Sequence, residues 1–142
     1  MVSGTISPDE SFAQDYDTKR SLAPILKSKM ENKIFYDKSS VNVDDQWLKL
    51  LFEVFKNIEE KQIDILMDMG VDAMPSEKQI KVYEFDEDNI VECSLRKKRL
   101  IESYDKIVKS LRDPFLVEVF SAFSEVEKIH LFFVDDSEGH RN

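Results

Sequence analysis

The chain of 142 residues is 42% hydrophobic and 35% charged, which is typical of a single globular domain and excludes an intrinsically disordered chain. No apolar run approaches the roughly 20 residues of a membrane span. The formal net charge of −9 argues against nucleic acid and anionic membranes as the main partners.

Apolar residues recur at steps of three and four positions in four stretches of the chain. These stretches cover residues 18–38, 44–69, 86–111 and 114–134, and in each the apolar residues fall on one side of a helix. Only three glycines and four prolines are available for tight turns, which disfavours a many-stranded β fold. We therefore predict an all-α protein with four amphipathic helices.

The links between these helices predict how they pair. Residues 39–43 and residues 112–113 are short links, so each joins two antiparallel neighbours into a helical hairpin. The connection between the hairpins, residues 70–85, contains Gly70 and Pro75 and is long enough to run along the side of a bundle. The expected order is hairpin, long crossover, hairpin.

Acidic residues mark where two of the helices begin. Asp44 or Asp45 can cap the second helix, because an aspartate side chain accepts hydrogen bonds from the first free N–H groups. Asp113 followed by Pro114 has the pattern of an N-cap and a proline at the first helical position.

Both ends of the chain are polar. Residues 1–17 are acidic, unlike a signal peptide or a mitochondrial presequence, and the last eight residues read DDSEGHRN. We expect a flexible N-terminal segment at residues 1–17, a helical bundle at residues 18–134, and a flexible acidic tail at residues 135–142.

The sequence matches itself at an offset of 68 residues, and Tyr36-Asp37-Lys38 falls on Tyr104-Asp105-Lys106 without a gap. The other matched pairs are Lys29 with Lys97, Asp45 with Asp113, Leu48 with Leu116, Phe52 with Phe120, Phe55 with Phe123, Glu59 with Glu127, and Gln62 with His130. We interpret the two hairpins as copies packed about a pseudo-two-fold axis.

The repeat preserves a framework of aromatic and carboxylate residues. Its members are Phe35-Tyr36, Leu51-Phe52 and Glu59-x-x-Gln62 in the first copy, and Tyr104, Phe120 and Glu127-x-x-His130 in the second. Over roughly residues 20–134 this pattern resembles the rubrerythrin-type branch of the ferritin-like superfamily. The resemblance implies a ferritin-like four-helix bundle made of two repeated hairpins joined by a long crossover. It also implies two irons in the bundle core, held by one glutamate from each first helix and a Glu-x-x-His pair from each second helix.

The glutamates of the first helices are missing from this sequence. In the family pattern each stands about seven residues before the tyrosine. Here Lys29 stands seven residues before Tyr36, and Lys97 stands seven residues before Tyr104. A shift of the frame by one or two residues would instead bring Glu31 or Glu102 into consideration, although Glu31 is rotated well away from the face of Tyr36.

The second helices keep most of the implied ligands. Glu59, Glu127 and His130 match the family pattern, and Gln62 stands where a histidine is expected. A di-iron centre needs carboxylates to bridge and neutralise its metals, so the loss of two carboxylates leaves a degenerate site. The three matching residues are then vestigial ligands, and Tyr36 and Tyr104 are their neighbours.

An ammonium group has no lone pair and repels a nearby metal ion. We therefore expect the lysine of each hairpin to form a buried ion pair with the glutamate of the same hairpin, with Gln62, His130 and the tyrosine hydroxyls completing the hydrogen bonds. In the alternative reading the two lysines extend into solvent, as lysines on amphipathic helices commonly do.

Two further features have plain structural interpretations. The basic run from Arg96 to Arg99 is too short to reverse the net charge, so we interpret it as one helix turn exposed to solvent. Lys97 is the exception, for the reason given above. Cys93 is the only cysteine, so an intrachain disulfide is excluded, and we expect a small buried hydrophobic residue in a reduced, cytoplasmic setting.

The leading hypothesis is a ferritin-like protein with an eroded di-iron site and no catalytic residues, which acts in binding, regulation or structure and needs no cofactor. By resemblance we expect a homodimer. One alternative is an iron-dependent, rubrerythrin-type peroxidase that takes electrons from a separate donor. Another is a protein that holds one divalent metal on Glu59, Glu127 and His130.

Overall fold

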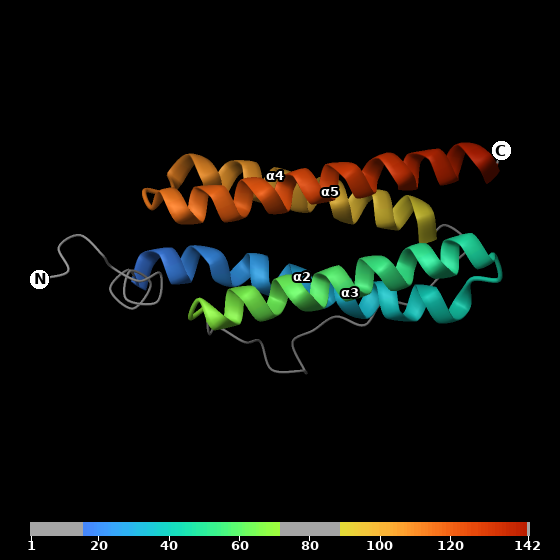
Figure 1. The fold of residues 1–142 in the computed structure, drawn as a ribbon, viewed down its shortest axis with the longest axis horizontal. Coiled ribbons are helices and arrows are strands. Elements are labelled where there is room, and N and C mark those ends of the chain that lie inside the picture. The colour runs from blue at the N-terminus through green and yellow to red at the C-terminus, as the bar shows by residue number, and fades with distance from the viewer. Residues whose placement is uncertain (1–15, 72–88, 142) are drawn as a thin grey trace, which may run out of the picture.

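A computed structural model describes residues 16–71 and 89–141 of the protein. Its helices are α2 (Tyr16–Asn42), α3 (Gln46–Asp68), α4 (Asn89–Ser110) and α5 (Pro114–Arg141) (Figure 1). These four helices confirm the predicted all-α fold. No helix in the described part of the chain is long and apolar enough to cross a membrane.

The helices form the two predicted hairpins. α2 packs along α3, and α4 packs along α5, with only residues 43–45 and 111–113 between the members of each pair. The Asp45 side chain accepts a hydrogen bond from the N–H of Leu48 at 3.1 Å, and the Asp113 side chain accepts one from the N–H of Phe115 at 2.9 Å. Both helix starts are therefore capped by aspartates, and Pro114 opens α5 as predicted.

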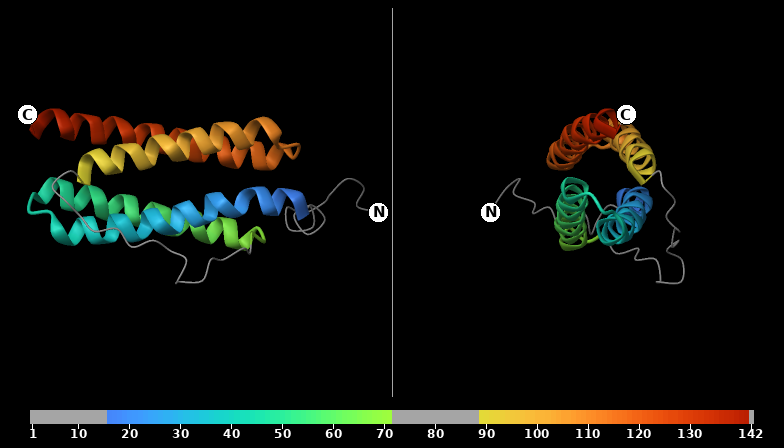
Figure 2. Two further views of the ribbon diagram at one scale, coloured as in Figure 1. Left: turned by 180° about the vertical axis from the view of Figure 1, so that it is seen from behind. Right: turned by 90° about the vertical axis from the view of Figure 1, so that its right-hand side faces the viewer.

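The hairpins stack on each other, with α3 and α5 on one side of the molecule and α2 and α4 on the other (Figure 2). α3 ends and α4 begins at opposite ends of the bundle, so the helices run up, down, down and up (Figure 1). The connection between the two hairpins therefore has to cover the length of the bundle. Most of the predicted crossover falls on residues 72–88, which lie outside the described residues.

Two apolar clusters fill the bundle, one on each side of a polar layer. One contains Leu22, Leu26, Ile63, Leu66, Leu100, Tyr104, Phe120 and Phe123, and the other contains Phe35, Tyr36, Leu48, Leu51, Phe52, Phe55, Ile90, Cys93 and Val134. Along each helix the residues between the two clusters include buried polar side chains, namely Lys29, Glu59, Gln62, Lys97, Glu127 and His130. The polar layer is thus enclosed by apolar packing above and below.

Two helices are longer than the periodicity predicted. α2 continues past residue 38 to Asn42, because side chains satisfy carbonyls of its last turns: Ser40 donates to Asp37 at 2.7 Å and Asn42 to Lys38 at 2.9 Å. α5 continues past residue 134 to Arg141, through most of the predicted flexible tail. Residues 135–138 contain neither proline nor glycine, so nothing in them stops the helix.

Candidate functional site

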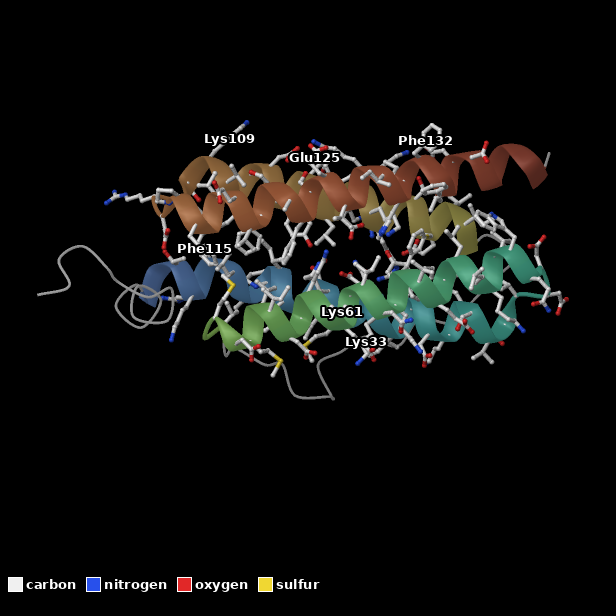
Figure 3. All side chains as sticks on the ribbon, viewed as in Figure 1. Lys33, Lys61, Lys109, Phe115, Glu125 and Phe132 are labelled. Atoms are coloured by element: carbon white, nitrogen blue, oxygen red, sulfur yellow. The ribbon has the colours of Figure 1, made fainter. Side chains whose placement is uncertain are left out.

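Two lysines are buried at the centre of the bundle. Lys29 of α2 and Lys97 of α4 expose 0% and 1% of their surface, whereas Lys33 and Lys109 point away from the bundle (Figure 3). Helical periodicity explains the burial, because Lys29 lies one turn after Leu26 and so shares its inward face. Of the two interpretations of these lysines, the structure supports the inward one.

Lys29 is held by residues of both hairpins. Its Nζ lies 2.7 Å from Oε1 of Glu59, the buried carboxylate of α3. The same ammonium donates hydrogen bonds to the side-chain oxygen of Gln62 and to the Tyr104 hydroxyl. It also lies 5.1 Å from the ring centre of Phe123, where the negative face of an aromatic ring attracts a cation.

Lys97 has the corresponding surroundings in the other half. Its Nζ lies 3.2 Å from Oε2 of Glu127 and 3.2 Å from Nδ1 of His130, both on α5. Two rings of the first hairpin cover the ammonium, with ring centres at 4.9 Å for Tyr36 and 3.7 Å for Phe55. The charge of Lys97 is therefore balanced within its own hairpin and enclosed by the other.

The two halves follow the internal repeat. Each lysine pairs with the glutamate of its own hairpin and with the residue three positions after that glutamate, and it lies against a tyrosine and a phenylalanine of the other hairpin. These contacts relate the halves by a pseudo-two-fold, as the offset of 68 residues predicted. We call the eight polar members, Lys29, Tyr36, Glu59, Gln62, Lys97, Tyr104, Glu127 and His130, the Lys–Glu cluster.

The tyrosines depart from this symmetry. The Tyr104 hydroxyl accepts a hydrogen bond from Lys29, whereas the buried Tyr36 hydroxyl accepts none from Lys97. The expectation that both hydroxyls complete the network is therefore wrong for Tyr36, because the contacts of Lys97 go to Glu127 and His130 instead. Burial raises the pKa of both phenols well above 10.0, so both stay neutral at physiological pH.

The buried charges of the cluster balance formally. Two ammonium groups face two carboxylates, Glu59 and Glu127, which are each 1% exposed. Burial raises the pKa of Glu59, the adjacent Lys29 ammonium opposes that rise, and Glu127 adds to it. A carboxylate in this position depends on its lysine, because without the lysine it would be a buried, unpaired charge close to a second carboxylate.

His130 is a neutral acceptor in this arrangement. Burial and the positive charge of Lys97 together lower its pKa from 6.5 to about 4, against the opposing effect of Glu127. An ammonium can only donate, so the contact with Lys97 requires that Nδ1 of His130 accepts and that the imidazole proton sits on Nε2. The ring packs on Phe55 with centroids 4.5 Å apart, which fixes its orientation.

These residues do not fit the two irons that the resemblance implies. Lys29 and Lys97 stand where carboxylate ligands are needed, and each ammonium contacts a glutamate that would otherwise be free to bind metal. Glu127 and His130 both contact Lys97, so the arrangement does not support a single metal on them either. Within residues 16–71 and 89–141, no three side chains of His, Cys, Asp or Glu are placed to hold a metal ion.

One buried residue was missed by the interpretation of the basic run. Arg96 is 5% exposed and donates from Nη1 to Oδ1 of Asn32 at 2.9 Å. Its Nε lies 3.1 Å from Glu92, and its guanidinium stacks 4.5 Å from the ring centre of Phe35. A signal was present in the sequence, because Arg96 lies three residues after Cys93 and therefore shares its buried face.

Comparison with known proteins does not assign a family. No protein-family model matches the sequence, and no curated protein matches it. The function proposed below is therefore based on the residues of the Lys–Glu cluster and on the exposed faces of the helices.

Proposed function

We propose that this protein is a non-catalytic relative of the rubrerythrin-type, ferritin-like proteins, with two Lys–Glu pairs in place of two irons. One observation carries the proposal: both lysines that replace the implied glutamates bury their ammonium groups against the two glutamates that remain. The lone buried thiol of Cys93 suits a reducing compartment, so we expect the protein to work in the cytoplasm.

The cluster gives the bundle a fixed register. Its contacts join α2 to α3 and α4, and α4 to α5, so sliding one helix by a turn would leave a charge buried without its partner. Such a mismatch costs several kcal/mol, whereas apolar residues tolerate many packings of similar energy. We therefore assign the cluster the structural role of the lost metals, which is to hold two hairpins in one arrangement.

Restoring the implied ligands tests the descent. The triple variant K29E/K97E/Q62H replaces both ammonium groups by carboxylates and completes the second Glu-x-x-His pair. We expect it to bind close to two ferrous ions per chain, and we expect iron to raise its melting temperature, because four buried carboxylates repel one another without metal.

The matched control is K33E/K128E, which makes the same change in net charge at exposed lysines. It should bind no stoichiometric iron. A folded triple variant that takes up no more iron than this control would contradict the descent from a di-iron protein.

A binding role is supported by an exposed apolar face on α3 and α5. Its members are Trp47, Leu50, Val54 and Ile65 on α3 and Phe115, Ile129 and Phe133 on α5, each between 42% and 56% exposed. The two helices lie on the same side of the molecule, and Phe115 lies on the side of α5 that faces the first hairpin (Figures 2 and 3). The repeat relates Trp47 to Phe115 and Ile65 to Phe133, so both hairpins carry exposed apolar residues at corresponding positions.

We assign this α3/α5 face to self-association. Seven large side chains at about half exposure offer on the order of 600 Å² of apolar surface, the upper end for one patch on a monomer. Adding the polar rim brings the area near the roughly 800 Å² per partner of a standard interface. Because the face is repeated about a pseudo-two-fold, it can meet the same face of a second copy.

Sedimentation equilibrium of L50E/I129E against the native protein tests this assignment. We expect a dimer for the native chain and a monomer for the variant, since each new carboxylate would have to be desolvated in the interface. V41E changes an apolar residue that is 73% exposed outside the face and should remain dimeric. A monomeric native protein at high micromolar concentration would refute the assignment.

A further inference from the structure

A polar cleft lies between α2 and α4, on the side of the bundle away from the α3/α5 face (Figure 2). Its volume is about 90 Å³, which is room for about three waters at ~30 Å³ each. The residues that line it are Ser28, Glu31 and Asn32 of α2 and Arg96, Arg99, Leu100 and Ser103 of α4. Ser28, Arg99 and Ser103 are exposed, so the cleft opens to solvent and a small solute can enter it.

The cleft lies on the pseudo-two-fold axis that relates the two hairpins. Six of its seven lining residues are repeat partners at the offset of 68 positions, namely Ser28 with Arg96, Glu31 with Arg99, and Asn32 with Leu100. Residues that a two-fold axis exchanges lie on opposite sides of that axis. The two walls of the cleft are therefore equivalent in the backbone, and they differ only in their side chains.

The most pronounced difference between the walls is one of charge. Glu31 on α2 and Arg99 on α4 occupy equivalent positions in the repeat. They line the same cleft, yet neither forms an ion pair with the other or with any other residue in the described ranges. One wall is thus negative and the other positive, with space between them. Such a pair of walls attracts a solute that carries both charges at matching ends.

The basic wall is held in place by packing. Arg96 is 5% exposed, and its guanidinium lies 4.5 Å from the ring centre of Phe35. Its Nη1 donates to Oδ1 of Asn32 at 2.9 Å, and its Nε lies 3.1 Å from Glu92, which offsets its charge. Because Oδ1 of Asn32 accepts from Arg96, the amide N–H groups of Asn32 are the ones left to donate to an oxyanion beside Arg99.

We propose that the α2/α4 cleft binds a small zwitterion of the free α-amino acid class. Its carboxylate meets the Arg99 guanidinium and the Asn32 amide, and its ammonium meets the Glu31 carboxylate, both as charge-assisted hydrogen bonds. A simple anion would face the repulsion of Glu31, and a simple cation that of Arg99. The volume suits about five non-hydrogen atoms, the size of glycine, and a longer side chain can extend through the open mouth.

This site is separate from the features of the proposed function. It uses neither the Lys–Glu cluster nor the α3/α5 face, so iron uptake by K29E/K97E/Q62H and the oligomeric state are independent measurements. Either proposal can fail while the other stands.

The experiment is a titration of the full-length, ¹⁵N-labelled chain with glycine, followed by the backbone amide shifts in ¹H–¹⁵N spectra. We expect saturable shifts confined to residues 28–32 and 96–103, with a Kd on the order of 1 mM, as befits so small a ligand. Acetate and methylammonium each carry one of the two charges. Both should bind at least about tenfold more weakly than glycine.

Two variants test the two walls separately. R99M and E31Q should each weaken glycine binding at least about tenfold, while circular dichroism shows them to be helical. Glu31 is half-buried and Arg99 is exposed, so neither change disturbs the core. The matched controls are K128M and E125Q, which make the same changes in charge at exposed residues of α5 and should bind glycine as the native chain does.

Three results would overturn the proposal. The first is the absence of saturable shifts up to about 50 mM glycine. The second is acetate binding as tightly as glycine, which would indicate a plain anion site. The third is native affinity in folded R99M or E31Q. The comparison of glycine with acetate needs only the native chain, so it decides the question even if a variant does not fold.

Discussion

Neutralising one member of a Lys–Glu pair should cost more than neutralising both. The second hairpin is a suitable place to measure this, because Lys97 and Glu127 form a buried ion pair at 3.2 Å. K97M removes the charge and nearly keeps the volume of the side chain, and E127Q does the same for the carboxylate. Each single change leaves its partner charged and buried, since both side chains are 1% exposed.

The expected magnitude follows from the separation of the charges. At 3.2 Å and an effective dielectric constant of about 20, the attraction between the two groups is about 5 kcal/mol, and desolvation offsets much of it. We expect each single variant to lose about 3–4 kcal/mol of unfolding free energy. The double variant should lose about 2–3 kcal/mol less than the sum of the two, which is the coupling between them.

The assay is a double-mutant cycle by urea denaturation, with the free energy of unfolding extrapolated to water. The matched control is the exposed pair Lys128–Glu125, whose atoms are 3.4 Å apart and whose side chains are 47% and 70% exposed. Screening by water should keep its coupling below about 0.5 kcal/mol. Additive effects at Lys97 and Glu127, within about 0.5 kcal/mol, would refute the pairing.

Two further predictions concern groups around the pair. The pKa of His130 is lowered from 6.5 to about 4 in the folded chain. Between these two pH values the unfolded chain binds a proton that the folded chain does not, so the free energy of unfolding should fall as the pH drops from 6.5 to 4. The loss should total about 3 kcal/mol and be absent from H130M; equal pH slopes for the two proteins would contradict the neutral, buried imidazole. Burial raises the pKa of Cys93 to about 12, so iodoacetamide at pH 8 should alkylate this thiol only at the rate of unfolding. Rapid alkylation of the folded chain would show that Cys93 is accessible.

The internal repeat is the reason that so much of the site was predictable. A match at 68 residues aligned Lys29 with Lys97 and Glu59 with Glu127, so one helical period sufficed to place both pairs on inward faces. The caps at Asp45 and Asp113 followed from local chemistry, which acts over three residues and is legible in the sequence.

Contacts between the hairpins were not predictable in the same way. The repeat relates Tyr36 to Tyr104 but does not predict their different contacts. The Tyr104 hydroxyl accepts a hydrogen bond from Lys29, whereas Lys97 lies over the ring of Tyr36. Such differences depend on how the hairpins slide and rotate against each other, which no pattern within a helix records. The burial of Arg96 is not predicted for a related reason: the interpretation treats four basic residues as one unit, although successive residues of a helix point in directions about 100° apart.

The metal content of the purified protein tests the central claim most directly. The protein is expressed in iron-supplemented medium, purified without chelators, and analysed for metals together with its near-ultraviolet absorption. Two ammonium groups at the ligand positions predict well under one metal per chain and no absorption from an oxo-bridged ferric pair. Two irons per chain with that absorption would show that Lys29 and Lys97 do not occupy the bundle centre, and the account would be wrong.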